Sequence, residues 1–339
     1  MDLDRCGGPR LGFGCVSLGS ASRGRSWKSD IRLVESAVDA GVTVFDTANA
    51  YGHGASEAIL GRALRGRRSS VVISTKVGYT FRERSLAEQT ARRMIAPVLA
   101  RARRSAQTAS TPNTTPNTAH NGSYTAQDFS VAAIKAGVDA SLRRLQTDHI
   151  DVLHLHAPRR VLPDAKAAVE ALVDAGKVRR FGIGAESLHV AAAWMDAGNV
   201  DVVQVPFGVL DPQAATEILP VARNSGTDVW IRGVLGGGYV SLAMNEHRRP
   251  GSTALRHDPK WPLLEELMET ARFAGVTLST LAMDYARSFP DVGVVLVGIH
   301  SDEHLSKNVA MMAGREPDGS LIEATQRVLD RWATADESI

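Results

Sequence analysis

The sequence of 339 residues predicts an α/β fold, a (β/α)8 TIM barrel formed as one domain over residues 1–339. Short runs rich in β-branched residues alternate eight times with longer amphipathic stretches, as strands and helices do in barrels of this length. A doubly wound sheet would have a Gly-rich turn after its first strand, and no G-x-G-x-x-G follows the first apolar run. The alternation therefore favours the barrel.

The eight predicted strands are brief, as buried parallel strands are. They cover residues 11–16, 42–46, 70–75, 149–156, 180–184, 201–205, 228–232 and 292–298. Predicted helices cover residues 30–41, 56–66, 130–145, 164–176, 188–198, 211–226, 262–275 and 302–314. Several of these helices end on Gly, which suits a left-handed C-cap.

Residues 85–129 interrupt the alternation after the third predicted strand. An Arg-rich helical stretch at 86–104 leads into residues 107–123, which are mostly Thr, Asn, Ser and Pro and offer almost nothing to bury. We predict a long flexible insertion, partly of low complexity, on the face of the barrel where active-site lids occur. An inert tether is the alternative.

Composition places the chain among soluble globular proteins, with 44% hydrophobic and 22% charged residues. A formal charge of +2 argues against nucleic acid or an anionic membrane as partner. Cys6 and Cys15 lie on one short segment, so neither a disulfide framework nor a metal site is expected, and a reducing cytoplasm is the expected location. The sequence does not indicate an oligomeric state.

Ionisable residues end three consecutive predicted strands. Asp46 ends the second, Lys76 follows the third and His156 ends the fourth, while Tyr51 lies on the loop after the second. Carboxyl ends of barrel strands face the active-site mouth, and neighbouring strands lie about 4.8 Å apart, so these four side chains can converge. His154 shares a strand face with His156 and is expected deeper in the barrel.

This constellation is typical of general acid/base chemistry. An ammonium at Lys76 is expected to lower the pKa of the Tyr51 phenol from about 10, and Asp46 is expected to hold Lys76 in place. His156 is suited to orienting a carbonyl. Each residue alone also fits a structural role, as an ion pair, a loop anchor or a satisfied strand end.

The sequence resembles the aldo-keto reductase superfamily in "GVTVFDTANAYGHGASEAILGRAL" (41–64), "ISTKVG" (73–78), "DHIDVLHLHAP" (148–158), "GKVRRFGIGAES" (176–187) and "DVVQVP" (201–206). Residues 11–20 and 51–57 look most like the aldose 1-dehydrogenases and pyridoxal dehydrogenases within it. The resemblance implies a catalytic tetrad of Asp46, Tyr51, Lys76 and His156, a nicotinamide cofactor as hydride donor, and a small carbonyl or sugar substrate. NADP is the expected cofactor of such a family member, with NAD as the alternative.

Cofactor contacts are implied in three places. The nicotinamide end corresponds to Gly184, Ala185, Gln204 and Arg232, although the family usually has Ser-Asn where Gly184-Ala185 stands. The Gly-rich loop after the seventh predicted strand suits phosphate binding through main-chain N–H groups, and the adenosine end corresponds to the segment after the eighth. The residues are Gly233, Leu235 and Gly237 in the loop, and Gly298, His300, Ser301, His304 and Asn308 at the adenosine end.

The leading hypothesis is therefore an NAD(P)-dependent oxidoreductase that transfers a hydride between nicotinamide and a carbonyl, alcohol or sugar lactol, with Tyr51 as general acid/base. One alternative is a barrel lyase that uses Lys76 to form a Schiff base. A second is a regulatory protein that binds the nucleotide without turnover.

Overall fold

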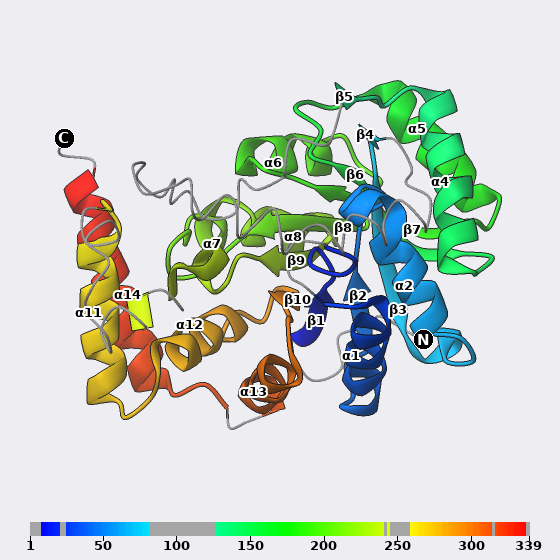
Figure 1. The fold of residues 1–339 in the computed structure, drawn as a ribbon. Helices are drawn as coiled ribbons and strands as arrows, with labels where there is room; N and C mark the ends of the chain where they lie inside the picture. The colour runs from blue at the N-terminus through cyan, green and yellow to red at the C-terminus, as the bar shows by residue number, and fades with distance from the viewer. Residues whose placement is uncertain are drawn as a thin grey trace, which may run out of the picture.

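The structure is a computed structural model that describes residues 8–20, 25–81, 126–240, 243–244, 258–313 and 316–336. Eight parallel strands form a closed barrel, which confirms the predicted fold class (Figure 1). Around the barrel the order is β1 (Arg10–Gly14), β10 (Val292–Gly298), β9 (Asp228–Arg232), β8 (Val202–Pro206), β7 (Val178–Gly184), β6 (Ile150–His156), β3 (Val72–Val77) and β2 (Val44–Asp46). Each predicted strand corresponds to one barrel strand, with ends displaced by up to two residues.

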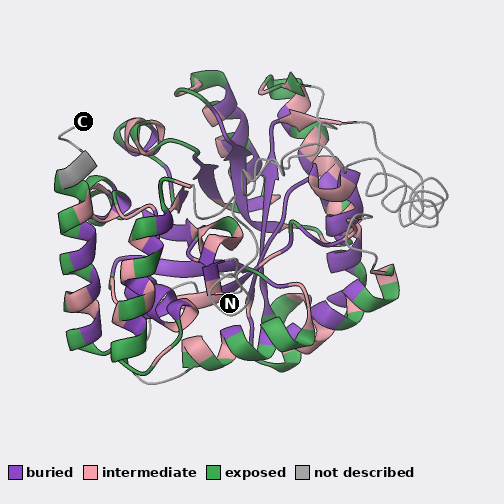
Figure 2. Cartoon of the chain, turned by 60° about the vertical axis from the view of Figure 1, so that its left-hand side comes forward, coloured by how far each residue is buried: buried purple, intermediate pink, exposed green. Residues whose placement is uncertain are grey.

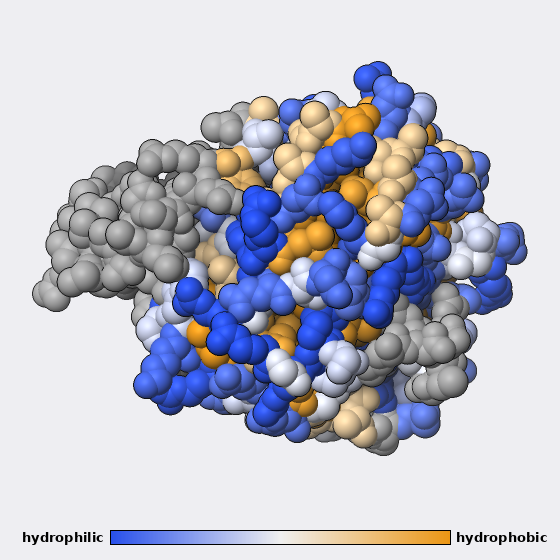
Figure 3. Space-filling model, turned by 90° about the vertical axis from the view of Figure 1, so that its right-hand side faces the viewer, coloured by the Kyte–Doolittle hydropathy of each residue, from blue (hydrophilic) through white to orange (hydrophobic). Residues whose placement is uncertain are grey.

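Helices surround the barrel and turn their apolar sides inward, and buried residues line the strands in Figure 2. Figure 3 shows the side on which α4 and α5 lie, where hydrophilic side chains alternate with apolar ones. No helix in the described ranges has the length and apolar character needed to cross a membrane. The helices are α1 (Trp27–Asp39), α2 (Ala55–Ala63), α4 (Val131–Leu145), α5 (Pro163–Asp174), α6 (Leu188–Asp196), α7 (Ala214–Glu217), α8 (Leu219–Ser225), α11 (Trp261–Phe273), α12 (Leu278–Arg287), α13 (Asp302–Ala313) and α14 (Gly319–Asp336).

The helix predictions need three corrections. The stretch 211–226 is two helices, α7 and α8, that meet at Ile218. Pro220 stands in the first turn of α8, where its missing N–H costs nothing, but the same residue inside one continuous helix would remove a hydrogen bond. Helices α12 and α14 were not predicted, although α12 contacts β10, whereas α11 lies at the edge of the molecule against α14.

The side chains inside the barrel form layers. The layer further from the carboxyl ends of the strands is apolar and consists of Val44, Val72, Val152, Val202, Trp230, Val294 and Leu296. On five of these strands the side chain two residues further along again faces inward, and there the sequence supplies Asp46, Ser74, His154, Gln204 and Arg232. The strand period thus concentrates polar groups near the carboxyl ends of the strands.

Strand β7 presents glycines to this polar layer. A Cβ added at Gly182 would lie 2.5 Å from Nδ1 of His154 and 3.1 Å from the oxygen of Val202. The His154 ring packs edge-on against Trp230, with ring centroids 5.9 Å apart, so it has little freedom to move. Gly182 therefore provides the space that the His154 imidazole fills.

We expect Gly182→Ala to lower the free energy of unfolding by about 1–3 kcal/mol, because overpacking forces His154 or β7 to shift. Urea denaturation measures the change. Gly184→Ala is the matched control on the same strand face, since its added Cβ would lie 3.6 Å from the nearest atom, an ordinary contact. Equal losses in both variants would contradict the steric explanation.

The β4–β5 hairpin, a two-stranded antiparallel sheet whose strands are separated in sequence by residues 81–125, lies at the carboxyl end of the barrel. Strands β4 (Tyr79–Thr80) and β5 (Ala126–Gln127) pair with Tyr79 opposite Gln127. Of the predicted insertion 85–129, residues 85–125 lie outside the described residues, and residues 126–129 contain β5. The insertion itself stays a prediction.

Candidate active site

Asp46 and Lys76 form a buried ion pair at the barrel mouth. Asp46 ends β2, and Lys76 lies near the end of the neighbouring strand β3. Asp46 is 5% exposed and Lys76 is 2% exposed. Lys76 Nζ donates to Asp46 Oδ2 at 2.5 Å and to the main-chain oxygen of Thr47 at 2.8 Å. Two acceptors therefore fix the ammonium.

The second carboxylate oxygen of Asp46 accepts from two side chains that orient it. Ser74 Oγ donates to Oδ1 at 2.8 Å, and Gln204 Nε2 donates to the same atom at 3.1 Å. Gln204, predicted for the nicotinamide end, is thus also a partner of Asp46. Sequence reasoning missed Ser74, although its position two residues before Lys76 places it on the same strand face.

Tyr51 begins the 3-10 helix Tyr51–Gly54 and lies close to two other members of the predicted tetrad, Lys76 and His156. Lys76 Nζ lies 5.4 Å from the centre of the Tyr51 ring, and the His156 ring stands edge-on at 5.9 Å. Gly52, His53 and Gly54 all have positive φ, so the chain turns sharply between Tyr51 and α2. The structure therefore brings all four predicted tetrad residues together.

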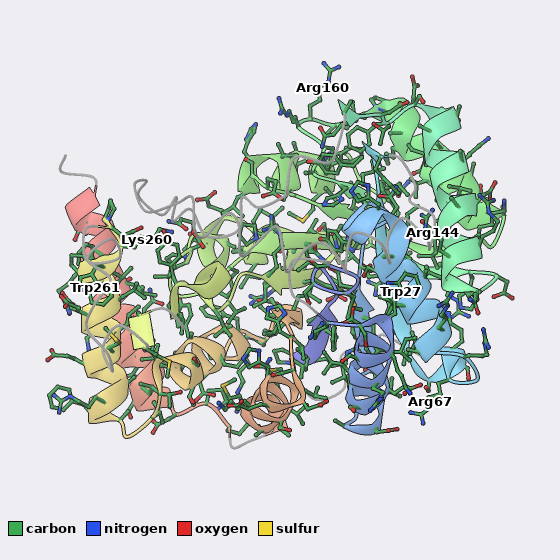
Figure 4. The ribbon with its side chains drawn as sticks, viewed as in Figure 1. Trp27, Arg67, Arg144, Arg160, Lys260 and Trp261 are labelled. Atoms are coloured by element: carbon green, nitrogen blue, oxygen red, sulfur yellow. The ribbon has the colours of Figure 1, made fainter. Side chains whose placement is uncertain are left out.

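Helix α2 fixes this loop through a buried carboxylate. Glu57 is fully buried, and its Oε1 accepts from Thr75 Oγ1 at 2.6 Å while Oε2 accepts from Arg144 Nε at 2.7 Å. Arg144 reaches across from α4 (Figure 4). Glu57 thus joins α2 to β3 and α4, which sets the position of the Tyr51 loop.

The predicted direction of the Tyr51 pKa is wrong. Burial raises the pKa of the phenol, and the negative charge of Asp46 adds to the rise. Arg232 is the cation that opposes this, whereas Lys76 is itself compensated by Asp46. Burial also lowers the pKa of Lys76, with Asp46 opposing that shift.

His156 ends β6 and is 6% exposed. The Tyr79 ring stands perpendicular to its imidazole, with centroids 4.8 Å apart. His154 lies two residues deeper and is fully buried, as expected. Depth thus separates the two histidines: His156 faces the mouth, and His154 belongs to the barrel interior.

Burial lowers the pKa of His154 to about 3 from 6.5, and the Lys76 charge adds to the shift. Between these two values the unfolded chain binds a proton that the folded chain does not, so stability falls as the pH falls. We expect the titration of His154 to lower the free energy of unfolding by about 2 kcal/mol as the pH falls from 7 to 5. His154→Leu should show a correspondingly smaller loss in urea titrations, and equal losses in both proteins would contradict the assignment.

The residues predicted for the nicotinamide end are neighbours. Gly184 of β7 is in register with Gln204 of β8, and the Ala185 N–H donates to the main-chain oxygen of Gln204 at 2.9 Å. Arg232 Nη2 donates to the Ala185 oxygen at 3.0 Å and lies 3.0 Å from Glu186 Oε2. The guanidinium therefore crosses the end of β8, above Gln204.

The predicted phosphate loop follows β9. Gly233 and Gly237 have φ of 80° and 60°, and a Cβ added at Gly233 would meet no atom within 4 Å. Leu235 packs against the hydrophobic core and anchors the loop. Uncovered glycine backbone in left-handed turns is suited to oxyanion binding through N–H groups.

The residues predicted for the adenosine end extend from the end of β10 into α13. His300 Nδ1 lies 3.0 Å from Ser17 Oγ, and its ring centroid is 5.8 Å from that of His304. The His304 N–H donates to Ser301 Oγ at 3.2 Å, which caps α13.

Of the other residues predicted for the adenosine end, Asn308 is buried, whereas Gly298 is exposed. Sequence reasoning missed Arg25, which donates to the main-chain oxygen of His300.

A cavity of about 600 Å³ opens at Ala157, the residue that follows His156, and its lining includes none of the four predicted tetrad residues. Aromatic, aliphatic and charged groups share its lining, which comprises Tyr79, Ala126, Gln127, Ala157, Pro158, Arg159, Glu186, Ser187 and Val190. These residues come from the β4–β5 hairpin and from the segments after β6 and β7.

Comparison with known proteins gives the family. The model of the aldo/keto reductase family matches residues 10–319. D-threo-aldose 1-dehydrogenase of a Pseudomonas species is 28% identical over 94% of this chain and 93% of its own length. Pyridoxal 4-dehydrogenase of Microbacterium luteolum is 25% identical over 91% and 90%. The holo form of an aldo-keto reductase from Bacillus halodurans superposes with a TM-score of 0.73 at 25% identity, covering 94% of this chain and 91% of that one. The chain therefore belongs to the aldo/keto reductase family and is an NAD(P)-dependent oxidoreductase.

Proposed function

We propose that this oxidoreductase interconverts a carbonyl and an alcohol, or a sugar lactol and its lactone, with Tyr51 as general acid/base. The observation that carries the proposal is the convergence of Tyr51 and His156 above the buried Asp46–Lys76 pair. A phenol between a fixed ammonium and an imidazole is within reach of a carbonyl oxygen placed at the mouth.

Tyr51 moves the proton in this proposal. Its pKa is raised by burial, so the phenol stays protonated at neutral pH and is ready to donate in the reductive direction. In the oxidative direction the same group must accept a proton, and Arg232 assists because its charge lowers the phenol pKa. Lys76 and Asp46 hold the donor geometry, and His156 orients the carbonyl oxygen.

The residues around the mouth fit a nicotinamide dinucleotide. Gly184 has no side chain at the strand end, and Arg232 lies next to it, since its guanidinium donates to the oxygen of Ala185. The exposed main chain at Gly233 and Gly237 suits the pyrophosphate, and His300, Ser301, His304 and Asn308 suit the adenosine end. When bound, the nicotinamide supplies or accepts the hydride. We take NADP as the preferred form.

The cavity at Ala157 supports a hydroxylated substrate. Its lining combines the polar residues Tyr79 and Ser187 and the charged residues Arg159 and Glu186 with Ala126 and Val190. A volume of about 600 Å³ accommodates a monosaccharide. Two relatives are named as dehydrogenases of an aldose and of pyridoxal, which agrees with a cyclic polar substrate.

The Schiff-base alternative requires a neutral, accessible amine at Lys76. That nitrogen instead donates to Asp46 and to the Thr47 oxygen, and the residue is 2% exposed. A neighbouring carboxylate keeps the lysine protonated, which opposes attack on a carbonyl.

The test is hydride transfer measured directly. The protein is titrated with NADPH and NADH, and then each complex is mixed with aldoses, aldehydes and ketones, using nicotinamide deuterated at C4. We expect deuterium in the product alcohol. Nucleotide binding without transfer to any substrate would favour a regulatory protein, and borohydride trapping of a lysine adduct without nucleotide would favour the lyase.

A further inference from the structure

The β4–β5 hairpin reaches the main chain at the end of β6. Gln127 Nε2 donates to the oxygen of His156 at 3.1 Å and to the oxygen of Ala157 at 3.0 Å. The two hydrogens of one amide nitrogen serve these two successive carbonyls. A single side chain thus fixes the peptide groups on both sides of the turn that follows His156.

That turn has an unfavourable conformation. Ala157 has a φ of 55°, in the left-handed region that residues with a Cβ rarely adopt. Its N–H donates to the oxygen of Gly184 at 2.8 Å, so β7 holds one side of the residue and Gln127 the other. Such a conformation persists only where its surroundings determine it. Loss of the Gln127 amide would let the turn relax, and His156 would move with it.

The same hairpin contacts the imidazole. Tyr79, the register partner of Gln127, places its ring at 90° to that of His156 with centroids 4.8 Å apart, a favourable edge-to-face arrangement. The Asp128 N–H donates to the Gly78 oxygen at 2.7 Å, and an added Cβ at Gly78, where φ is 127°, would lie 2.2 Å from the Phe129 ring. The hairpin therefore packs closely at its start and contacts both the ring and the main chain of His156.

We infer that Gln127 is a positioning residue of the active site, which acts on His156 through the main chain of the turn at Ala157. The inference rests on the role of His156 in the proposed hydride transfer. Gln127 lies on β5, outside the barrel, so this function belongs to the hairpin rather than to the eight strands.

The kinetic test compares Gln127→Met, which keeps the length but removes the donors, with Gln127→Lys, which keeps a donor. We expect Gln127→Met to lower kcat about 10- to 100-fold with little change in nucleotide affinity, because small misplacements near a reacting group are costly. Gln127→Lys should recover most of the loss. Thr80→Val is the matched control, since it removes the hairpin bond from Thr80 Oγ1 to the Ala126 oxygen and should leave turnover unchanged.

Nitrogen NMR of the His156 imidazole is the second readout. We expect its signals to shift in Gln127→Met and Gln127→Glu, and to keep their wild-type positions in Thr80→Val. Unchanged signals in both Gln127 variants would overturn the inference, as would equal kinetic losses in Gln127→Met and Thr80→Val. If wild-type protein transfers no hydride, the proposed function fails, while the NMR comparison still decides whether Gln127 positions His156.

Discussion

Asp46→Asn is expected to lower the free energy of unfolding by about 3–5 kcal/mol, because it leaves the ammonium of Lys76 buried without its counter-charge. Lys76 is 2% exposed, so water cannot replace the carboxylate. Deprotonation of Lys76 would offset part of the cost, since burial already lowers its pKa. Turnover should fall about 10²–10³-fold, because the charge beside Tyr51 is lost or misplaced. Urea denaturation and steady-state kinetics measure the two effects.

The double variant Asp46→Asn with Lys76→Met separates stability from catalysis. Removing both charges relieves the buried ammonium, and the Asn oxygen can still accept from Ser74 and Gln204. We expect stability within about 1 kcal/mol of wild type, with turnover still lost. Recovery of turnover together with stability would show that the pair is only structural.

The barrel was predictable because its strands have a strong pattern. Runs such as residues 292–298 are uniformly apolar, and only a strand buried on both faces needs that composition. The convergence of the four predicted tetrad residues was predictable for a related reason, since residues at carboxyl ends of adjacent strands must meet at one mouth. Both inferences use local sequence and a fixed topology, and neither depends on side-chain detail.

Other features depend on contacts between distant segments. Gln127 is separated from His156 by 29 positions, and its two hydrogen bonds have no local pattern. Helix α12 was missed although its residues have a clear amphipathic pattern, with Leu278, Leu281 and Tyr285 among those it buries. The pKa of Tyr51 was assigned the wrong direction because burial, which no sequence pattern measures, exceeds the effect of nearby cations.

Tyr51→Phe is expected to reduce turnover about 10²–10⁴-fold in both directions, because the variant keeps the ring and removes only the proton-bearing oxygen. The ring contacts with Lys76 and His156 should persist, so the loss belongs to the proton rather than to packing. Nucleotide affinity, measured by fluorescence titration, should change less than about twofold. Tyr285→Phe is the control: its hydroxyl donates to Gln326 at 3.2 Å in the α12–α14 contact, away from the mouth.

The raised pKa of Tyr51 also predicts how the two directions differ with pH. The phenol stays protonated through neutral pH, so reduction should show no loss of rate from Tyr51 between pH 6 and about pH 9, where an unperturbed phenol with a pKa near 10 would begin to titrate. Oxidation needs the deprotonated group, so its rate should rise with pH across the same window.

Arg232→Gln removes the cation that lowers the phenol pKa, and it should therefore slow oxidation more than reduction. Equal slowing would mean that Arg232 only binds the nucleotide, and a Tyr51→Phe variant with full turnover would exclude the phenol as proton donor.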